Sequence, residues 1–356
     1  MKWSNYNAIA SILVCWVVMF SCKEDNPLPP LGTMPEQLTL NSGKDEDPTV
    51  LQARDGSFYV AWFSDRDGNP EIWMTRTADG IIWEEPWKIT NDPAEDLYPQ
   101  LTESRSGGFY LTWFHIAFDA TLQQFTFHIW FAKSIDGKIW TDHKQLSESA
   151  STFNWVPSIM EDSNGRIWIA YTSGRLDLNK EIYLQYSDDK GATWNMEPVR
   201  VTTSALADDF PFIIQSKSGT YLIAWARYND SLGLFNPTSE NMLATSTDGL
   251  TWSSPQVVSP ADLSATITDT LPHLFSEING NGVFMVWTSD RGGNGGNIFS
   301  APLPSATGST VLVQRTANGK AYSGRMIPTS LGKYLMVWVS TENAATQPDI
   351  FYQFVD

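Results

Sequence analysis

Cysteine is almost absent from this chain of 356 residues. Its two cysteines, Cys15 and Cys22, both lie close to the N-terminus. The rest of the chain therefore contains no disulfide and no thiolate metal site. Basic residues are also few, because 23 Lys and Arg stand against 40 Asp and Glu, which gives a formal net charge of −17 at pH 7. Such a surface repels phosphate backbones, so we expect no nucleic-acid partner.

Several catalytic and cofactor motifs are also missing. The sequence has no H-E-x-x-H zinc motif, no G-x-S-x-G nucleophile elbow and no phosphate-binding loop. The glycine-rich segment 292–297 lacks the lysine and the following helix of a nucleotide site. No long stretch has helical periodicity. We therefore expect no cofactor and no metal site, with calcium left open.

The N-terminal segment has the composition of a signal peptide. Lys2 precedes an apolar stretch at residues 8–20, which is too short to span a bilayer. The small residue before Cys22 resembles a bacterial lipobox, and the acidic residues after it resemble the surface-export signal of Bacteroidota lipoproteins. This resemblance implies a signal peptide at 1–21, a lipidated Cys22 with a proline-rich tether at 22–36, and a protein anchored by lipid on the outer membrane. The alternative is an ordinary secretory signal.

Two patterns repeat along the rest of the chain. Short apolar runs, a turn with glycine and an alternating aromatic run indicate pairs of strands. Six such pairs occur, and each is followed by a third strand and usually a fourth. Four polar turns of the Ser/Thr-x-Asp-Gly type close on a tryptophan, and the closing residues, 54 to 58 positions apart, are Trp83, Trp140, Trp194 and Trp252. Repeats of this length indicate an architecture of stacked or radial units.

The last unit lacks a fourth strand, because the chain ends at Asp356. Residues 37–40 resemble an outer strand and can supply it. Four-stranded sheets repeated radially and closed by a terminal strand make a β-propeller. We therefore predict an all-β domain at 37–356 with six blades, whose last blade is closed by the N-terminal strand, and we expect a monomer.

The four turns resemble the Asp boxes, or bacterial neuraminidase repeats, of the sialidase superfamily. The match is complete at Ser187, Asp189, Gly191, Thr193 and Trp194. In that superfamily the boxes lie on the face opposite the ligand site, so the resemblance implies a structural role for Asp189. Function does not follow from the fold alone.

One sialidase feature is not found. Sialidases carry an Arg-Ile-Pro motif whose arginine binds the substrate carboxylate. The residues two positions before the prolines that lead the blades are Glu46, Leu97, Trp155, Asp209 and Thr270. Arg325 and Pro328 resemble the motif only superficially, because the proline stands closer to the glycine of its turn. We therefore expect an activity other than that of a typical sialidase.

Positions that break the repeat are the candidate site. Two long connections, 115–127 and 227–240, predict a site over blades 2 to 4. The candidate catalytic residues are Asp209, Asp208, Asp47 and His115. The candidate substrate-binding residues are Trp155, Tyr98, Arg175, Arg227, Tyr228 and Arg325. A second location over blades 5, 6 and 1 would use His273, Arg325 and Asp47.

Three functions fit these residues. Paired carboxyl groups and a stacking tryptophan favour a glycoside hydrolase-like protein that acts on a glycan or polysaccharide. A propeller that binds a glycan or a protein without reacting is the second alternative. A polysaccharide lyase that uses a histidine and a tyrosine to remove a proton is the third.

Overall fold

The computed structural model describes residues 34–147, 153–174, 179–229, 238–259, 267–291, 295–303, 312–342 and 347–356. These residues contain strands and turns but no helix. The strands form six antiparallel four-stranded sheets. In the described part of the chain, no helix has the length and apolar character needed to cross a membrane. Cys22 and Arg175 fall outside the described residues.

The first three blades follow the chain in order. Blade 1 consists of β2 (Asp45–Gln52), β3 (Phe58–Ser64), β4 (Glu71–Thr77) and β5 (Trp87–Lys88). Blade 2 consists of β6 (Glu95–Glu103), β7 (Phe109–Asp119), β8 (Gln124–Ser134) and β9 (Trp140–Gln145). Blade 3 consists of β10 (Asn154–Glu161), β11 (Ile167–Ser173), β12 (Glu181–Ser187) and β13 (Val199–Arg200).

The remaining blades repeat this order until the last strand. Blade 4 consists of β14 (Asp208–Gln215), β15 (Tyr221–Tyr228), β16 (Ser239–Ser246) and β17 (Gln256–Val257). Blade 5 consists of β18 (Asp269–Ser276), β19 (Val283–Ser289), β20 (Asn297–Leu303) and β21 (Val313–Gln314). Blade 6 consists of β22 (Ala321–Pro328), β23 (Tyr334–Ser340), β24 (Asp349–Val355) and, from the N-terminal side, β1 (Glu36–Gln37).

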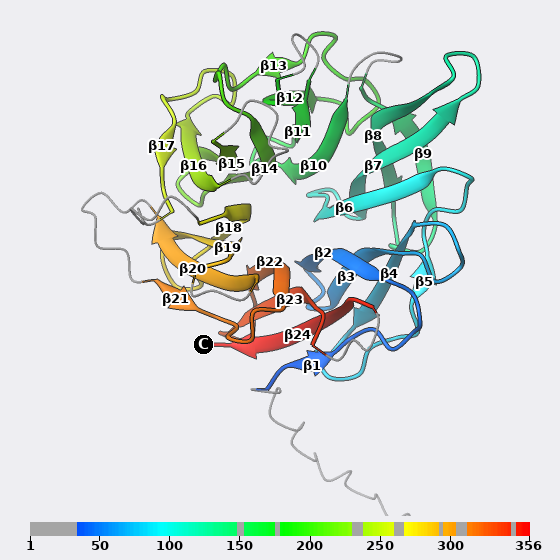
Figure 1. The fold of residues 1–356 in the computed structure, drawn as a ribbon, viewed down its shortest axis with the longest axis vertical. Helices are drawn as coiled ribbons and strands as arrows, with labels where there is room; N and C mark the ends of the chain where they lie inside the picture. Colours follow the sequence, from blue (N-terminus) through cyan, green and yellow to red (C-terminus); the bar gives the residue numbers. More distant parts are fainter. Residues whose placement is uncertain are drawn as a thin grey trace, which may run out of the picture. The chain divides into compact units, whose positions relative to one another are not determined.

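The six sheets form a closed ring, which confirms the predicted six-bladed propeller (Figure 1). The first strand of each blade lies nearest the centre, and β2 contacts both β6 and β22, so the ring closes between blades 6 and 1. β1 pairs with β24 through Glu36 with Tyr352 and Gln37 with Phe351. The predicted closing strand is thus present, but it begins one residue earlier and ends before Leu40, which is exposed.

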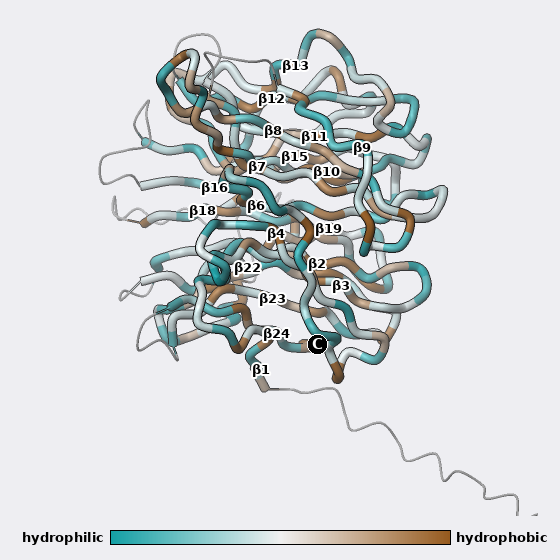
Figure 2. Tube along the Cα trace, turned by 90° about the vertical axis from the view of Figure 1, so that its right-hand side faces the viewer, coloured by the Kyte–Doolittle hydropathy of each residue, from teal (hydrophilic) through white to brown (hydrophobic). Residues whose placement is uncertain are grey.

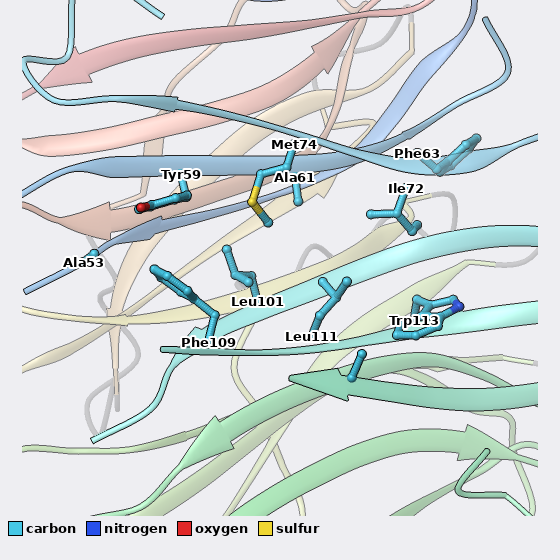
Figure 3. Packing of buried hydrophobic residues seen from close by; sticks show 11 residues of the cluster. Ala53, Tyr59, Ala61, Phe63, Ile72, Met74, Leu101, Phe109, Leu111 and Trp113 are labelled. Atoms are coloured by element: carbon cyan, nitrogen blue, oxygen red, sulfur yellow. The ribbon is translucent and has the colours of Figure 1, made fainter. Parts of the chain in front are cut away.

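The hydrophobic core lies between neighbouring blades. Apart from the end of β7 beyond His115, the second strands are almost completely buried. The aromatic residue in the middle of each is exposed by 4% or less; these residues are Trp62, Trp113, Tyr171, Trp225, Trp287 and Trp338. Figure 3 shows how side chains of blade 1 meet Leu111 and Trp113 of blade 2. Successive side chains of a strand point to opposite faces of the blade. Apolar residues occur on both faces, since both are covered by neighbouring blades.

Antiparallel order gives the ring two faces, with turns gathered at either end of the strands (Figure 2). The loop face carries the starts of the first strands and the connections from second to third strands. The turn face carries the connections from third to fourth strands, where the four tryptophan-closed turns lie. These two names are used below.

One expected loop is an extended hairpin. The segment 115–127 of blade 2 continues β7 and β8, which pair as far as Asp119 with Gln124. Aromatic and β-branched residues alternate along it, and the rings of Phe118 and Phe125 lie opposite each other with centroids 5.5 Å apart. Cross-strand pairs of this kind stabilise strands. The corresponding connection of blade 4 is described only up to residue 229 and from residue 238.

Candidate functional site

Each first strand has a bulge at the same place, close to the loop face. The register shifts in all six blades, and the residue inside each shift has a left-handed backbone with φ between 46° and 56°. These residues are Asp47, Tyr98, Val156, Phe210, Leu271 and Ser323. Five of them precede a proline and Ser323 precedes Gly324. Bulges redirect side chains, and left-handed non-glycine residues cost free energy, so a conformation kept in every blade points to a shared purpose.

Asp47 is the acidic member of this set. It is 7% exposed, and Ser323 Oγ donates a hydrogen bond of 2.6 Å to its Oδ1 across the junction of blades 1 and 6. Burial raises the pKa of Asp47 to about 6, against the lowering effects of Ser323 and of the Arg325 charge. A carboxyl group with this pKa exchanges a proton near neutral pH, as general acids and bases must.

Arg325 lies within electrostatic reach of Asp47. The guanidinium is 4% exposed, and burial lowers its pKa to about 10 although Asp47 and Tyr98 favour its charge. Its Nη1 donates to Gly324 O at 3.2 Å, while its Nε has no hydrogen-bond partner among the described residues. Buried guanidinium donors are normally satisfied, so this group has capacity to bind a ligand oxygen. Arg325 lies after the bulge of β22. The arginine of the sialidase motif instead stands two residues before the proline that leads the blade.

Two further side chains border Asp47. Glu46 is half-buried, and Tyr322 Oη donates to its Oε1 at 2.5 Å. The charge of Asp47 and burial raise the pKa of Tyr98 well above its ordinary value, with Asp209 and Glu46 adding to the effect. Tyr98 therefore remains protonated and is a hydrogen-bond donor at the axis. Residues of blades 6, 1 and 2 are thus brought together, although they are far apart in the sequence.

Asp209 is surrounded by donors. Its Oδ1 accepts hydrogen bonds from Trp155 Nε1 at 2.8 Å and from Thr172 Oγ1 and Phe210 N, both at 2.9 Å. Lys180 Nζ donates to its Oδ2 at 2.9 Å, and the same ammonium lies 4.5 Å from the centroid of Trp155. The carboxylate therefore orients the indole ring and is itself ion-paired. Sequence reasoning missed Lys180, which directly precedes a buried strand and carries no motif.

Trp155 belongs to a short row of aromatic rings. Its ring lies 6.0 Å from that of Phe153, which lies 4.8 Å from Phe127 of the blade 2 hairpin. Phe153 is 42% exposed and Trp155 is half-buried, so the row offers apolar ring surface on the loop face. Flat rings that are partly exposed can stack on a sugar.

Asp208 and Arg227 form a bidentate ion pair, with bonds of 2.7 and 2.8 Å. Asp208 is fully buried. It stands three residues before its proline, a position that holds an aspartate in four blades, as Asp45, Asp96, Asp208 and Asp269. This recurrence can be read from the sequence, and it makes Asp208 a repeated position rather than one that breaks the repeat. Tyr228 is buried and its hydroxyl lies 3.2 Å from Thr270 Oγ1.

The two histidines have different surroundings. His115 Nδ1 lies 2.7 Å from Asp96 Oδ1. His273 is buried against Phe212, with ring centroids 4.1 Å apart, and burial lowers its pKa well below the ordinary value. His273 is therefore neutral at physiological pH. His115, Asp208 and Asp209 do not share the contacts that join Asp47, Ser323 and Arg325.

On the turn face the acidic residues bind backbone. Gly191 N donates to Ser187 Oγ at 2.8 Å, and Asp189 accepts from Thr193 N and Thr193 Oγ1, both at 2.7 Å. These bonds lower the pKa of Asp189 to about 2. The same hydrogen bonds to backbone lower the pKa of the other three turn acids, Asp79, Asp136 and Asp248. Such acids are ionised caps of their turns.

Comparison with known proteins supports the architecture. No curated protein matches the sequence. A crystal structure of a protein of unknown function from Dyadobacter fermentans is similar with a TM-score of 0.72 and 16% identity, over 90% of this chain and 98% of that chain. A mutant of the NanB sialidase from Streptococcus pneumoniae is similar with a TM-score of 0.65 and 12% identity, over 90% of this chain and 70% of that one.

A third similar structure is the sialidase of Trypanosoma rangeli in complex with the inhibitor DANA. The TM-score is 0.64 at 12% identity, and the match covers 88% of this chain but 55% of the sialidase, so this chain corresponds to about half of that protein. Residues 56–273 match the BNR repeat-like domain, which is more than half of the sequence. This chain therefore belongs to the family of BNR repeat-like domains, and its fold is a six-bladed propeller similar to that of the sialidases.

Proposed function

We propose that the protein acts on a glycan at the axis of the loop face and cleaves a glycosidic bond there, with Asp47 as the proton donor. The observation that carries this proposal is a buried carboxyl group of pKa about 6 within electrostatic reach of a buried arginine, whose Nε has no hydrogen-bond partner among the described residues. Strongly perturbed groups that meet at the centre of a ligand face are candidates for catalysis.

Glycoside hydrolysis needs a carboxyl group that donates a proton to the leaving oxygen and a second group on the other side of the bond. Asp47 has the pKa for the first role. Glu46, held by Tyr322, and Asp209, held by Lys180, are the carboxylates that can serve as its partner. Arg325 and Tyr98 supply hydrogen-bond donors for sugar oxygens, and Trp155 supplies a flat ring.

The test is a panel of polysaccharides in which product release and binding are both measured on purified protein. Asp47→Asn keeps the acceptor for Ser323 but cannot donate the proton, so a substrate found in the panel should be bound and not cleaved. Asp189→Asn on the turn face is the matched control and should cleave normally. Full activity of Asp47→Asn would reject the proposed acid.

A glycan-binding propeller without catalysis is the second candidate. It is favoured by Asp208 and Asp209, because both carboxylates are taken up by cations of the protein itself. This alternative is supported if a glycan binds, no product is released by any preparation, and Trp155→Ala weakens the binding.

Sialic acid is not the expected product. None of the five residues two positions before a blade-leading proline is arginine. We therefore expect no appreciable turnover of a fluorogenic sialoside, and turnover that disappears in Asp47→Asn would show this expectation to be wrong.

Membrane anchoring is proposed from the N-terminal sequence. The apolar stretch before Ser21 and Cys22 supports lipidation of Cys22 and attachment to the outer membrane. Cells labelled with a fatty-acid analogue should mark the wild-type protein but not Cys22→Ser. An unlabelled wild type would favour an ordinary secretory signal.

A further inference from the structure

A buried acid at the start of the first strand recurs in four of the six blades, and in three of these four an arginine neutralises it. Asp45 accepts from Arg66 Nη2 at 2.9 Å, and Asp208 forms its bidentate pair with Arg227. Asp269 of blade 5 is paired with Arg291. The position is Asn154 in blade 3 and Ala321 in blade 6. Buried carboxylates without a cation are costly, so this pattern is physically expected.

Blade 2 is the exception. Asp96 is fully buried, and its Oδ1 meets both Trp113 Nε1 and His115 Nδ1 at 2.7 Å. No arginine or lysine pairs with it among the described residues, and its Oδ2 has no hydrogen-bond partner there. The nearby Thr90 hydroxyl donates its single hydrogen to Glu71 Oε2 at 2.7 Å. In the described part of the chain, one oxygen of this buried carboxylate therefore lacks a hydrogen-bond partner.

Further carboxylates surround this atom. Asp92 lies in the connection between β5 and β6, and ligand atoms of Asp92, Asp96 and His115 all lie within 4.8 Å of one another. Glu71 is buried beside them and accepts from Asp92 N at 3.1 Å. Lys88 on the neighbouring strand is paired with Asp67 at 3.0 Å. Among the described residues, His115 is the one potential cation that pairs with Asp96, so the carboxyl groups of the cluster outnumber the cations beside them.

We propose that Asp92, Asp96 and His115 bind a divalent transition-metal cation, with Zn²⁺ as the best fit. One imidazole nitrogen and two carboxylate oxygens are ligands of zinc, whereas calcium and magnesium take oxygen ligands. Ligands at zinc distances lie about 3.4 Å apart in a tetrahedron. Binding would displace the proton between His115 Nδ1 and Asp96 Oδ1, which lie 2.7 Å apart, and these groups would separate slightly. The exposed Asp92 can move inward to reach this spacing, and a water molecule can complete the coordination.

The cation would neutralise Asp96 in blade 2, as arginines neutralise the corresponding aspartates in blades 1, 4 and 5. It would also join the connection at Asp92 to His115 on β7, across the junction between blades 1 and 2. A ligand that binds only the folded protein stabilises it by mass action. This inference does not depend on the proposed glycosidase activity.

The experiment uses the purified protein without an affinity tag, treated with a chelator and dialysed. Titration with ZnCl₂ in a calorimeter should show one site per chain, and Zn²⁺ should raise the melting temperature. Asp92→Asn keeps its acceptor for Ala94 N and should weaken the affinity at least about 10-fold to 100-fold, as expected for the loss of groups that hold a metal. Asp96→Asn should abolish binding without lowering the melting temperature of the metal-free protein, because it removes a buried charge that no arginine or lysine of the described residues neutralises.

The matched control is Asp65→Asn. Asp65 is an acid of blade 1 on the same face, and it accepts from Lys44 N at 2.7 Å much as Asp92 accepts from Ala94 N. This variant should bind Zn²⁺ like the wild type. Absence of a one-site Zn²⁺ titration, equal affinities for Asp92→Asn and Asp65→Asn, or binding of Ca²⁺ in preference to Zn²⁺ would each overturn the proposal.

Discussion

On the turn face, the exposed Asp189 accepts hydrogen bonds from Thr193 and has a pKa of about 2, whereas on the loop face the buried Asp47 has a pKa of about 6. The first is ionised throughout the physiological range, and the second titrates within it. Hydrogen bonds to the charged form produce one value and desolvation produces the other. The same residue type is therefore an ionised cap where the repeat is regular and a buried, titratable carboxyl group where six strands converge.

The largest expected effect is the loss of turnover in Asp47→Asn. Removal of a general acid typically lowers a rate by about 10²-fold to 10⁴-fold. The variant should remain folded, because its amide oxygen can still accept the hydrogen bond from Ser323. Steady-state rates on a substrate from the glycan panel, together with thermal melting of both proteins, provide the measurement. An Asp47→Asn protein that is inactive because it is unfolded would indicate a structural role for Asp47, like that of Asp189. This result would contradict the contrast between the loop face and the turn face.

The second effect is a pH dependence of stability with opposite signs on the two faces. For Asp47 the folded pKa is raised from 3.8 to about 6, so the folded state holds the proton more tightly and stability falls as pH rises through this window. A tenfold change in a protonation equilibrium is worth about 1.4 kcal/mol, so the full change is on the order of 3 kcal/mol. Asp47→Asn should therefore gain stability relative to the wild type by up to this amount between pH 4 and pH 7.

For Asp189 the folded pKa is lowered to about 2, so its contribution is present above pH 3.8 and is lost as pH falls toward 2. Denaturant unfolding of wild type, Asp47→Asn and Asp189→Asn across pH 2 to 7 separates the two trends. Ser323→Ala adds a further check, because loss of its hydrogen bond should raise the pKa of Asp47. In a plot of glycan turnover against pH, the decline on the alkaline side should then shift to higher pH. Parallel curves for the two aspartate variants would refute the assignment.

The fold could be predicted because the repeat carries it. Six strand pairs, four closing tryptophans and a matching N-terminal segment indicate the blades, their number and the closing strand before any coordinates are known. The extended hairpin of blade 2 was less accessible, since residues 115–127 contain Asp119 and Gln123 and look like a loop. Pairing of Phe118 with Phe125 across the hairpin outweighs that local signal.

The candidate site could be predicted only in part. Asp47, Tyr98 and Arg325 were identifiable as residues near the loop face, but their mutual electrostatic effects arise from three different blades. The proline after Asp47 marks the bulge, yet the left-handed backbone and the burial that raises the pKa depend on the closed ring. Ser323 had no visible signal because glycine replaces proline in blade 6. The aspartates that stand three residues before the proline in four blades, in contrast, can be recognised as a repeat in the sequence.

A smaller effect is expected at the edge of the loop face. Trp155→Ala removes an aromatic ring that is half-buried beside Phe153, and one stacking contact is worth on the order of 1 kcal/mol, so the affinity for a bound glycan should fall several-fold. Trp155→Phe keeps a ring but loses the N–H that donates to Asp209. If stacking matters, Phe should retain most of the affinity that Ala loses, as measured by calorimetry. Equal losses in both variants would assign the effect to Asp209 instead.

The smallest effect belongs to the turn face. Asp189→Asn keeps one acceptor for Thr193 N but loses the charge and weakens the bond to the Thr193 hydroxyl, so one of four similar turns is disturbed. A change of this kind in a surface turn should lower the melting temperature by on the order of 1–3 °C. Turnover and glycan affinity should equal those of the wild type, because the connection between third and fourth strands lies at the opposite end of the blades from Asp47. A variant of Asp189 that melts normally but loses activity would reverse the roles of the two faces, and with them the location proposed for the site.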